Sequence, residues 1–140
     1  MSYCAAVPRP PLPAELQEFL AKPNPAVIAT VRPDGFPHPV ATWYEWVDGR
    51  VLVNMDASRS RLAHMRRDPR VAVDVLDEDD WYTHLLITGV VVDIRPDPDL
   101  ADIDRLAQRY AGRPHRDRNR RSVTALIEPE SWFAWGSWET

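Results

Sequence analysis

Short segments of β-branched and aromatic residues, separated by tight turns, are the feature of this sequence that most limits its fold. Such segments occupy residues 26–31, 36–47 and 50–56, and residues of these types favour strands. The turn residues Pro33-Asp34-Gly35 and Asp48-Gly49 stand between them, as in β-hairpins. Because a hairpin joins neighbouring strands in antiparallel order, this part of the chain predicts an antiparallel sheet.

The same kind of pattern continues through the second half of the chain. Valine alternates with other residues over 70–76, which is the period of a half-buried strand. Further strands are predicted at residues 81–94, 123–127 and 132–138, and Gly89 predicts a bulge or bend inside the first of these. Glycine and proline at the bends favour closure of the sheet. The predicted fold class is therefore mainly β, a small six-stranded antiparallel barrel with short helices.

Three short helices are predicted at connections between these strands. Each combines apolar residues three or four apart with a recognisable helix start or stop. The predicted helices cover residues 13–22, the segment from a candidate N-cap at Asp56 or Ser58 to Pro69, and the segment from residues 97–99 to Gly112.

Length and composition indicate one folded domain. The 140 residues, 44% of them hydrophobic, are enough for a single core. The proline-rich residues 1–12 are predicted to form a flexible N-terminal arm, and residues 13–140 to form the domain. Cys4 is the only cysteine and lies in this arm, so no intramolecular disulfide can form.

Charge and motif content argue against several classes of function. A net charge of −4 is unlike a general nucleic-acid-binding protein, which would be basic. No apolar run is long enough for a membrane span and no signal peptide is visible, so we expect a cytoplasmic protein. The four histidines lack metal-ligand spacing, which predicts no metal site. His38 and His84 are interpreted as surface, interface or hydrogen-bonded buried residues, with proton donation by His38 as the alternative.

Residues 54–70 carry the most informative charge pattern. Arg59 and Arg61 lie in the first turn of the predicted helix, where cations oppose the helix dipole unless an anion binds. With Ser58 and Ser60 beside them, these arginines are typical of a phosphate site at a helix start. A solvated surface helix without a ligand is the alternative interpretation.

Two further groups of residues allow both a functional and a structural interpretation. Trp43, Tyr44 and Trp46 would form a wall for a planar ligand, or would pack in the core or in an interface. The arginine-rich residues 113–121 are expected to form a solvated loop, with contact to the anionic tail of a long cofactor as the alternative.

Four blocks of the chain, taken in order, match a known pattern. They are residues 26–31, residues 33–40 leading into Trp43-Tyr44, residues 58–61 and residues 65–71. The most specific part is the strand, basic helix start and closing Asp68-Pro69-Arg70. On these blocks, over roughly residues 14–138, the chain resembles the pyridoxamine 5′-phosphate oxidase-like, flavin-binding split-barrel family. It is most similar to the branch that uses the deazaflavin coenzyme F-420, and this implies an antiparallel split barrel.

The resemblance also implies which residues bind a cofactor. Arg59 and Arg61 would bind the cofactor phosphate, and Ser58 and Ser60 would hydrogen-bond to it. Arg61 stands where family members usually have lysine, so the charge is kept and a planar fork is added.

Contacts to the ring system and to a partner subunit are implied in the same way. Asn54 and Met55 would lie along the ring system. Family members are homodimers with two cofactor sites at the subunit interface, so Trp81 and Tyr82 would reach the partner's cofactor.

The leading hypothesis is an oxidoreductase dependent on coenzyme F-420, which transfers hydride between the cofactor and a small unsaturated or quinone-like substrate. One alternative keeps the fold and uses FMN, because the two arginines would serve either phosphate. Another alternative is a non-catalytic protein that binds a flavin, haem or a similar planar ligand.

Overall fold

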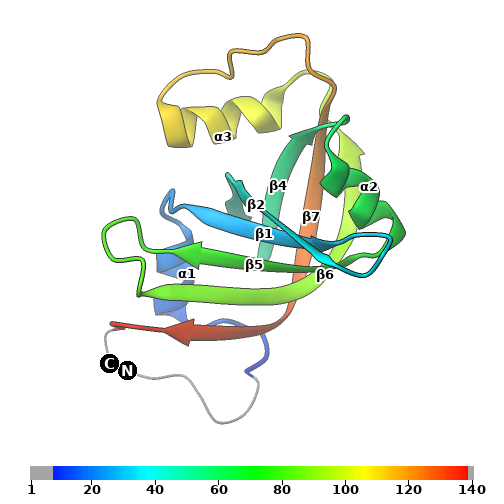
Figure 1. Ribbon diagram of the computed structural model, residues 1–140. Coiled ribbons are helices and arrows are strands. Elements are labelled where there is room, and N and C mark those ends of the chain that lie inside the picture. Colours follow the sequence, from blue (N-terminus) through cyan, green and yellow to red (C-terminus); the bar gives the residue numbers. More distant parts are fainter. Residues whose placement is uncertain (1–7, 139–140) are drawn as a thin grey trace.

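The computed structural model describes residues 8–138, so Cys4 and most of the predicted arm lie outside the described residues. The chain forms a mainly β fold around one antiparallel sheet, with three helices at its connections (Figure 1). In order along the chain, the elements are α1 (Ala14–Leu20), β1 (Ala26–Val31), β2 (Pro37–Thr42), β3 (Glu45–Val47), β4 (Arg50–Asp56), α2 (Ser60–Arg67), β5 (Arg70–Leu76), β6 (His84–Pro96), α3 (Ala101–Ala111) and β7 (Ser122–Trp135).

The sheet has seven strands in the order β2-β1-β5-β6-β7-β4-β3, where six were predicted. The strands β2 and β3 form its two edges and do not pair with each other, so the sheet curls but does not close. This agrees with a split barrel and corrects the strand count. Among the described residues, no helix is long and apolar enough to cross a lipid bilayer.

The single strand predicted over residues 36–47 is broken at Trp43 and Tyr44 into β2 and β3. Tyr44 is fully buried, and its hydroxyl donates to the carbonyl oxygens of Leu20 at 2.9 Å and Lys22 at 2.8 Å. These bonds to the end of α1 draw the chain away from β1. It then re-enters the sheet as β3, paired with β4.

The two segments predicted over 123–127 and 132–138 are instead one long strand, β7, which pairs with β6 along its length. A register shift lies between Thr88 and Gly89, as predicted at Gly89, but the extra residue is Glu130 of β7. A Cβ atom at Gly89 would collide with the carbonyl oxygen of Glu128, so only glycine fits there. Pro129 is tolerated in β7 because it lies next to this extra residue.

The strand β6 begins at His84 and not at Trp81, because an acid-rich turn precedes it. The backbone N–H of Asp80 donates to the carboxylate of Asp77 at 3.1 Å, and the Thr83 hydroxyl donates to Asp80 at 2.9 Å. Trp81 therefore lies in a turn.

Helix starts also differ from the predicted ones. The N-cap of α2 is Arg59, whereas Asp56 uses its carboxylate to accept from the backbone N–H of Ser58 at 2.9 Å. The helix α3 begins at Ala101, after Leu100 in a left-handed conformation with φ 60°. The predicted helix-start residue Asp97 nevertheless stabilises this helix start from three residues before Leu100, because its carboxylate accepts from two N–H groups of the first turn.

Apolar packing places a helix on each side of β4. The main core inside the curled sheet includes Leu16 of α1 and Val53 of β4, both fully buried. A second cluster forms on the opposite face of β4, where Leu52 packs against Ile103 and Leu106 of α3. Because both faces of β4 are covered, its five central residues are all buried and, apart from Asn54, apolar, so the strand does not alternate.

Candidate functional site

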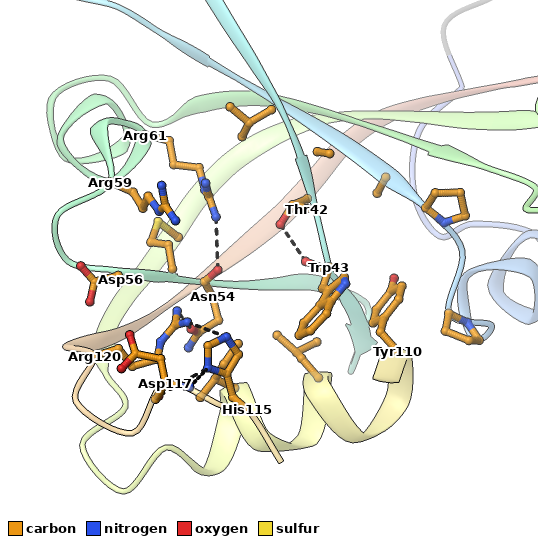
Figure 2. A pocket seen from close by; sticks show the side chains of 18 of the residues that line it. Thr42, Trp43, Asn54, Asp56, Arg59, Arg61, Tyr110, His115, Asp117 and Arg120 are labelled. Carbon is orange, nitrogen blue, oxygen red and sulfur yellow. Dashed lines mark hydrogen bonds between the residues drawn. The ribbon is translucent and has the colours of Figure 1, made fainter. Parts of the chain in front are cut away.

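A cleft of about 1220 Å³ opens between α3, the start of α2 and the end of β2 (Figure 2). One part of its lining is rich in arginine, with Asp56 and Asp117 also in the lining, and the other part is aromatic and aliphatic. The arginine end contains Arg59, Arg61 and Arg120, and the aromatic end contains Trp43 and Tyr110. The cleft is large enough for a cofactor of nucleotide size, since ligand pockets commonly measure about 300–1,000 Å³.

Arg61 is partly buried and is not electrostatically satisfied. One Nη atom donates to the backbone carbonyl of Asn54 at 3.4 Å, while Nε is buried with no hydrogen-bond partner among the described residues. Burial lowers the pKa of the Arg61 guanidinium, and the positive charges of Arg59 and Arg120 lower it further. Because an arginine side chain stays charged in proteins even when its pKa is lowered, this end of the cleft favours an anion.

Arg120 belongs to the loop between α3 and β7 and was not among the predicted site residues. Its guanidinium donates to Oδ1 of Asn54 at 3.0 Å and lies 3.1 Å from Nε2 of His115. Its Nε is also buried without a partner among the described residues. Burial lowers the pKa of Arg120, while the nearby carboxylates of Asp56 and Asp117 act in the opposite direction.

The local sequence gives no reason to single out Arg120 from its neighbours. What places Arg120 in the cleft is the pairing of β7 with β4. This pairing aligns Asp56 with Ser122, and so brings the residues before β7 to the end of β4. That pairing is not visible in sequence spacing. The loop was expected to be solvated, and Arg118 fits that expectation, since it pairs with Asp104 at 2.6 Å on the surface.

Asn54 and Met55 line the cleft but are 6% and 1% exposed. The Asn54 amide is held in a buried network, where Nδ2 donates to Thr124 Oγ1 at 3.1 Å and Oδ1 accepts from the Ser122 hydroxyl at 3.0 Å. Met55 packs in the main core. Only small parts of both side chains therefore reach the cleft.

The two predicted serines differ in position. Ser58 lines the cleft, and its hydroxyl donates to the carboxylate of Asp56. This hydrogen bond is the main reason that the pKa of Asp56 falls to about 2. Ser60 is the exposed first residue of α2 and is not part of the cleft lining.

Trp81 and Tyr82 do not line the cleft of their own chain. They are 75% and 53% exposed, and Tyr82 meets Trp135 edge-on at 6.3 Å between ring centroids. Phe133 stacks on Trp135 at 5.8 Å. We call these four residues the aromatic patch.

The aromatic end of the cleft is formed by two stacked rings. Trp43 stacks on Tyr110 with ring centroids 5.4 Å apart and an interplanar angle of 5°. The Tyr110 hydroxyl donates to the carbonyl oxygen of Asn24 at 2.7 Å, and burial raises the pKa of Tyr110. Of the other two predicted aromatics, Tyr44 is fully buried and Trp46 packs against the core. Only Trp43 of the three forms a wall of the cleft.

Three of the four histidines lie away from the cleft. His64 is buried and hydrogen-bonded to the Thr30 hydroxyl at 2.9 Å, and His38 meets it edge-on at 5.0 Å. His84 contacts the carbonyl of Tyr82 at 3.0 Å through Nδ1. Among the described residues, no three side chains of metal-ligating type come together.

Comparison with known proteins places this geometry in context. A family model described as pyridoxamine 5′-phosphate oxidase matches residues 12–136. No curated protein matches the chain. A solved structure named F420 reductase is 31% identical, with the alignment covering 86% of this chain and 98% of that one at a TM-score of 0.78.

Two other solved structures show the same architecture. A conserved hypothetical protein of Mycobacterium tuberculosis is 26% identical over 95% of this chain and 89% of its own, with a TM-score of 0.71. General stress protein 26 of Bacillus anthracis, at 20% identity over 86% of this chain and 91% of its own, shares the fold with a TM-score of 0.66. The family match spans nearly the whole sheet and the cleft, and the chain belongs to the pyridoxamine 5′-phosphate oxidase family.

Proposed function

We propose that this protein is an oxidoreductase that binds the deazaflavin coenzyme F-420 in the cleft and exchanges hydride with a small unsaturated or quinone-like substrate. The observation that carries the proposal is the group of three arginines in the cleft, two of which are partly buried and keep a buried Nε without a partner among the described residues. The 31% identity to an F420 reductase supports the choice of cofactor.

The chain's own residues fit the parts of such a cofactor. Arg59 and Arg61 bind the phosphate, because arginine presents several donors in a fork that matches its oxygens. The bound deazaflavin supplies the hydride chemistry, and the protein supplies binding, orientation and exclusion of water. Trp43, Ile103 and Leu106 exclude water from the other end of the cleft, since their side chains are aromatic or aliphatic.

A fluorescence titration of the purified protein with coenzyme F-420 and, separately, with FMN tests the proposal. The six tryptophans give a strong intrinsic signal, and Trp43 lies in the cleft wall. Quenching at micromolar coenzyme F-420 but not at micromolar FMN is the expected result. Tighter binding of FMN would transfer the protein to the FMN-dependent alternative. Binding of neither would overturn the proposed function.

A homodimer is part of the proposal, and the aromatic patch supports it. Three of its side chains, Trp81, Tyr82 and Trp135, are at least 46% exposed, and aromatic residues are enriched in subunit interfaces. Light scattering at micromolar concentration should give the mass of a dimer, and Trp135→Ser should shift it toward a monomer. Phe36→Ser is the control, because Phe36 is 66% exposed and lies outside the patch. A monomeric mass for the unmodified chain would contradict the dimer.

A further inference from the structure

Arg120 enters the cleft from outside the sequence motif that contains Arg59 and Arg61. It lies two residues before β7, and β7 pairs with β4 up to the point where the chain turns toward α2. Figure 2 shows the three arginines around Asn54, with Arg59 and Arg61 on one side of β4 and Arg120 on the other. The sheet thus brings together cations that are separated by about half of the chain.

The charge of Arg120 is not balanced by a carboxylate at hydrogen-bond distance. Its guanidinium donates to Oδ1 of Asn54, which belongs to a neutral amide, and its other polar neighbour is the ring nitrogen Nε2 of His115. No ion pair among the described residues includes Arg59, Arg61 or Arg120. By contrast, Arg118 of the same loop forms a surface ion pair.

The orientation of the Asn54 amide is fixed from the opposite side. Its Nδ2 lies 3.4 Å from a carboxylate oxygen of Asp97, which can only accept. Asp97 is itself held by N–H groups of the first turn of α3 and by the Ser122 hydroxyl at 2.8 Å. The amide NH₂ must therefore face Asp97, and Oδ1 must face Arg120.

We propose that Arg120 is a third ligand for the oxyanion of the bound cofactor, and that Asn54 is the positioning residue that aims it. The inference rests on the proposed function, because the oxyanion is the one that Arg59 and Arg61 bind. An incoming oxyanion would take the buried Nε donors that the protein leaves without partners, and would offset the mutual repulsion that lowers the pKa of Arg61.

The first experiment compares Arg120→Ala with Arg121→Ala. Both changes remove one positive charge from the same loop, but the Arg121 side chain is exposed and outside the cleft. Affinity for coenzyme F-420, for FMN and for inorganic pyrophosphate is measured by calorimetry at one ionic strength. Arg120→Ala should weaken binding about 10- to 100-fold, which is the effect of one charge-assisted hydrogen-bonding group, and Arg121→Ala by less than about twofold. Equal effects of the two variants would overturn the inference.

Arg120→Lys separates charge from geometry. Lysine keeps the positive charge but lacks Nε–H and the planar fork. An affinity between those of the unmodified chain and Arg120→Ala is expected. Full retention of affinity in Arg120→Lys would show that only the net charge matters, and would contradict the role given to the Nε donor.

A double-mutant cycle tests the positioning role of Asn54. Asn54→Ala should weaken pyrophosphate binding in the unmodified chain, but should have no further effect on binding in the Arg120→Ala background. Its effect on unfolding should persist in both backgrounds, because the bonds to Thr124 and Asp97 are lost in either. Loss of affinity that is equal in the two backgrounds would show that Asn54 does not act through Arg120.

Failure of this inference can be told apart from failure of the proposed function. If the unmodified chain binds coenzyme F-420 and Arg120→Ala binds it equally well, Arg120 is not a ligand and the function stands. If the chain binds neither coenzyme F-420 nor FMN but its pyrophosphate affinity still depends on Arg120, the oxyanion site stands and the cofactor assignment fails.

Discussion

The two ends of the cleft differ in whether their polar groups find partners within the protein. At the aromatic end, Trp43 and Tyr110 stack in parallel, and the Tyr110 hydroxyl has a carbonyl partner at 2.7 Å. At the arginine end, two guanidinium groups keep buried Nε atoms without partners among the described residues, and like charges lower the pKa of Arg61. The polar groups of the first end are satisfied within the protein, whereas the second end leaves two buried donors without partners among the described residues.

This contrast distinguishes residues that stabilise the fold from residues that the fold keeps in place at a cost in stability. Side chains that complete their contacts inside the molecule contribute to stability whether or not a ligand binds. Unbalanced buried charge costs stability and persists in natural proteins mainly at functional sites. Substitutions at the two ends should therefore affect different measurements.

The largest effect on stability is expected from Tyr110→Ala. The change removes a partly buried aromatic ring, its stack on Trp43 and its hydrogen bond to Asn24, and should lower the free energy of unfolding by about 2–4 kcal/mol. Urea denaturation measures this. Tyr110→Phe, which keeps the ring, is the control and should cost about 1 kcal/mol. A loss below about 1 kcal/mol in Tyr110→Ala would remove the distinction between the two ends.

Arg61→Ala should lower cofactor affinity without lowering the stability of the unliganded protein. We expect coenzyme F-420 binding to weaken by about 1–3 kcal/mol, since a charge-assisted hydrogen bond is lost. The unliganded variant should unfold at the same urea concentration as the unmodified chain or at a higher one, because a partly buried charge with like-charged neighbours has been removed. Unchanged cofactor affinity would exclude Arg61 from the site. A clear loss of stability without ligand would assign it a structural role.

A smaller, pH-dependent effect on stability is expected at Asp97, which is hydrogen-bonded to Asn54 and to the first turn of α3. Burial alone would raise the pKa of Asp97, but hydrogen bonds from Asp102, Ser122, Ile103 and Asn54 outweigh it and lower the pKa below its ordinary value. Such a carboxylate contributes stability above about pH 4, which is lost as the pH falls through the folded-state pKa.

Asp97→Asn should therefore cost about 1–2 kcal/mol of unfolding free energy at pH 7, the scale of hydrogen bonds to a charged group. Urea denaturation at a series of pH values should show this difference shrinking as the pH falls from about 5 toward 2. Asp99→Asn, on an exposed neighbour, is the control. A difference that is constant over this range would mean that ionisation of Asp97 does not stabilise the fold.

The part of the site that could be predicted is the part that is local in sequence. Arg59 and Arg61 lie two residues apart at a helix start, so periodicity and helix electrostatics indicate their role. Arg120 becomes visible only when Ser122 is known to lie opposite Asp56 across two strands. Strand register of this kind depends on packing of the whole sheet and leaves no signature in spacing.

The fold was predictable to a similar extent and for similar reasons. The antiparallel class follows from hairpin turns and alternation, and the bulge follows from Gly89 alone. The break between β2 and β3 depends on bonds from Tyr44 to carbonyl oxygens of α1, more than 20 residues earlier. The continuity of β7 depends on its own extra residue, Glu130, which lies beside Pro129 at the register shift.

The two residues between β2 and β3, Trp43 and Tyr44, connect α1 and α3 with a wall of the cleft. Tyr44 fastens to the end of α1, while Arg109 of α3 donates both to the Tyr44 carbonyl at 3.2 Å and to the Lys22 carbonyl at 2.6 Å. Trp43, the adjacent residue, is a wall of the cleft. The N-terminal helix thus helps to position one wall of the cleft, although no residue of α1 lines the cleft. A chain that began after α1 would retain its arginines and lose the anchor of the opposite wall.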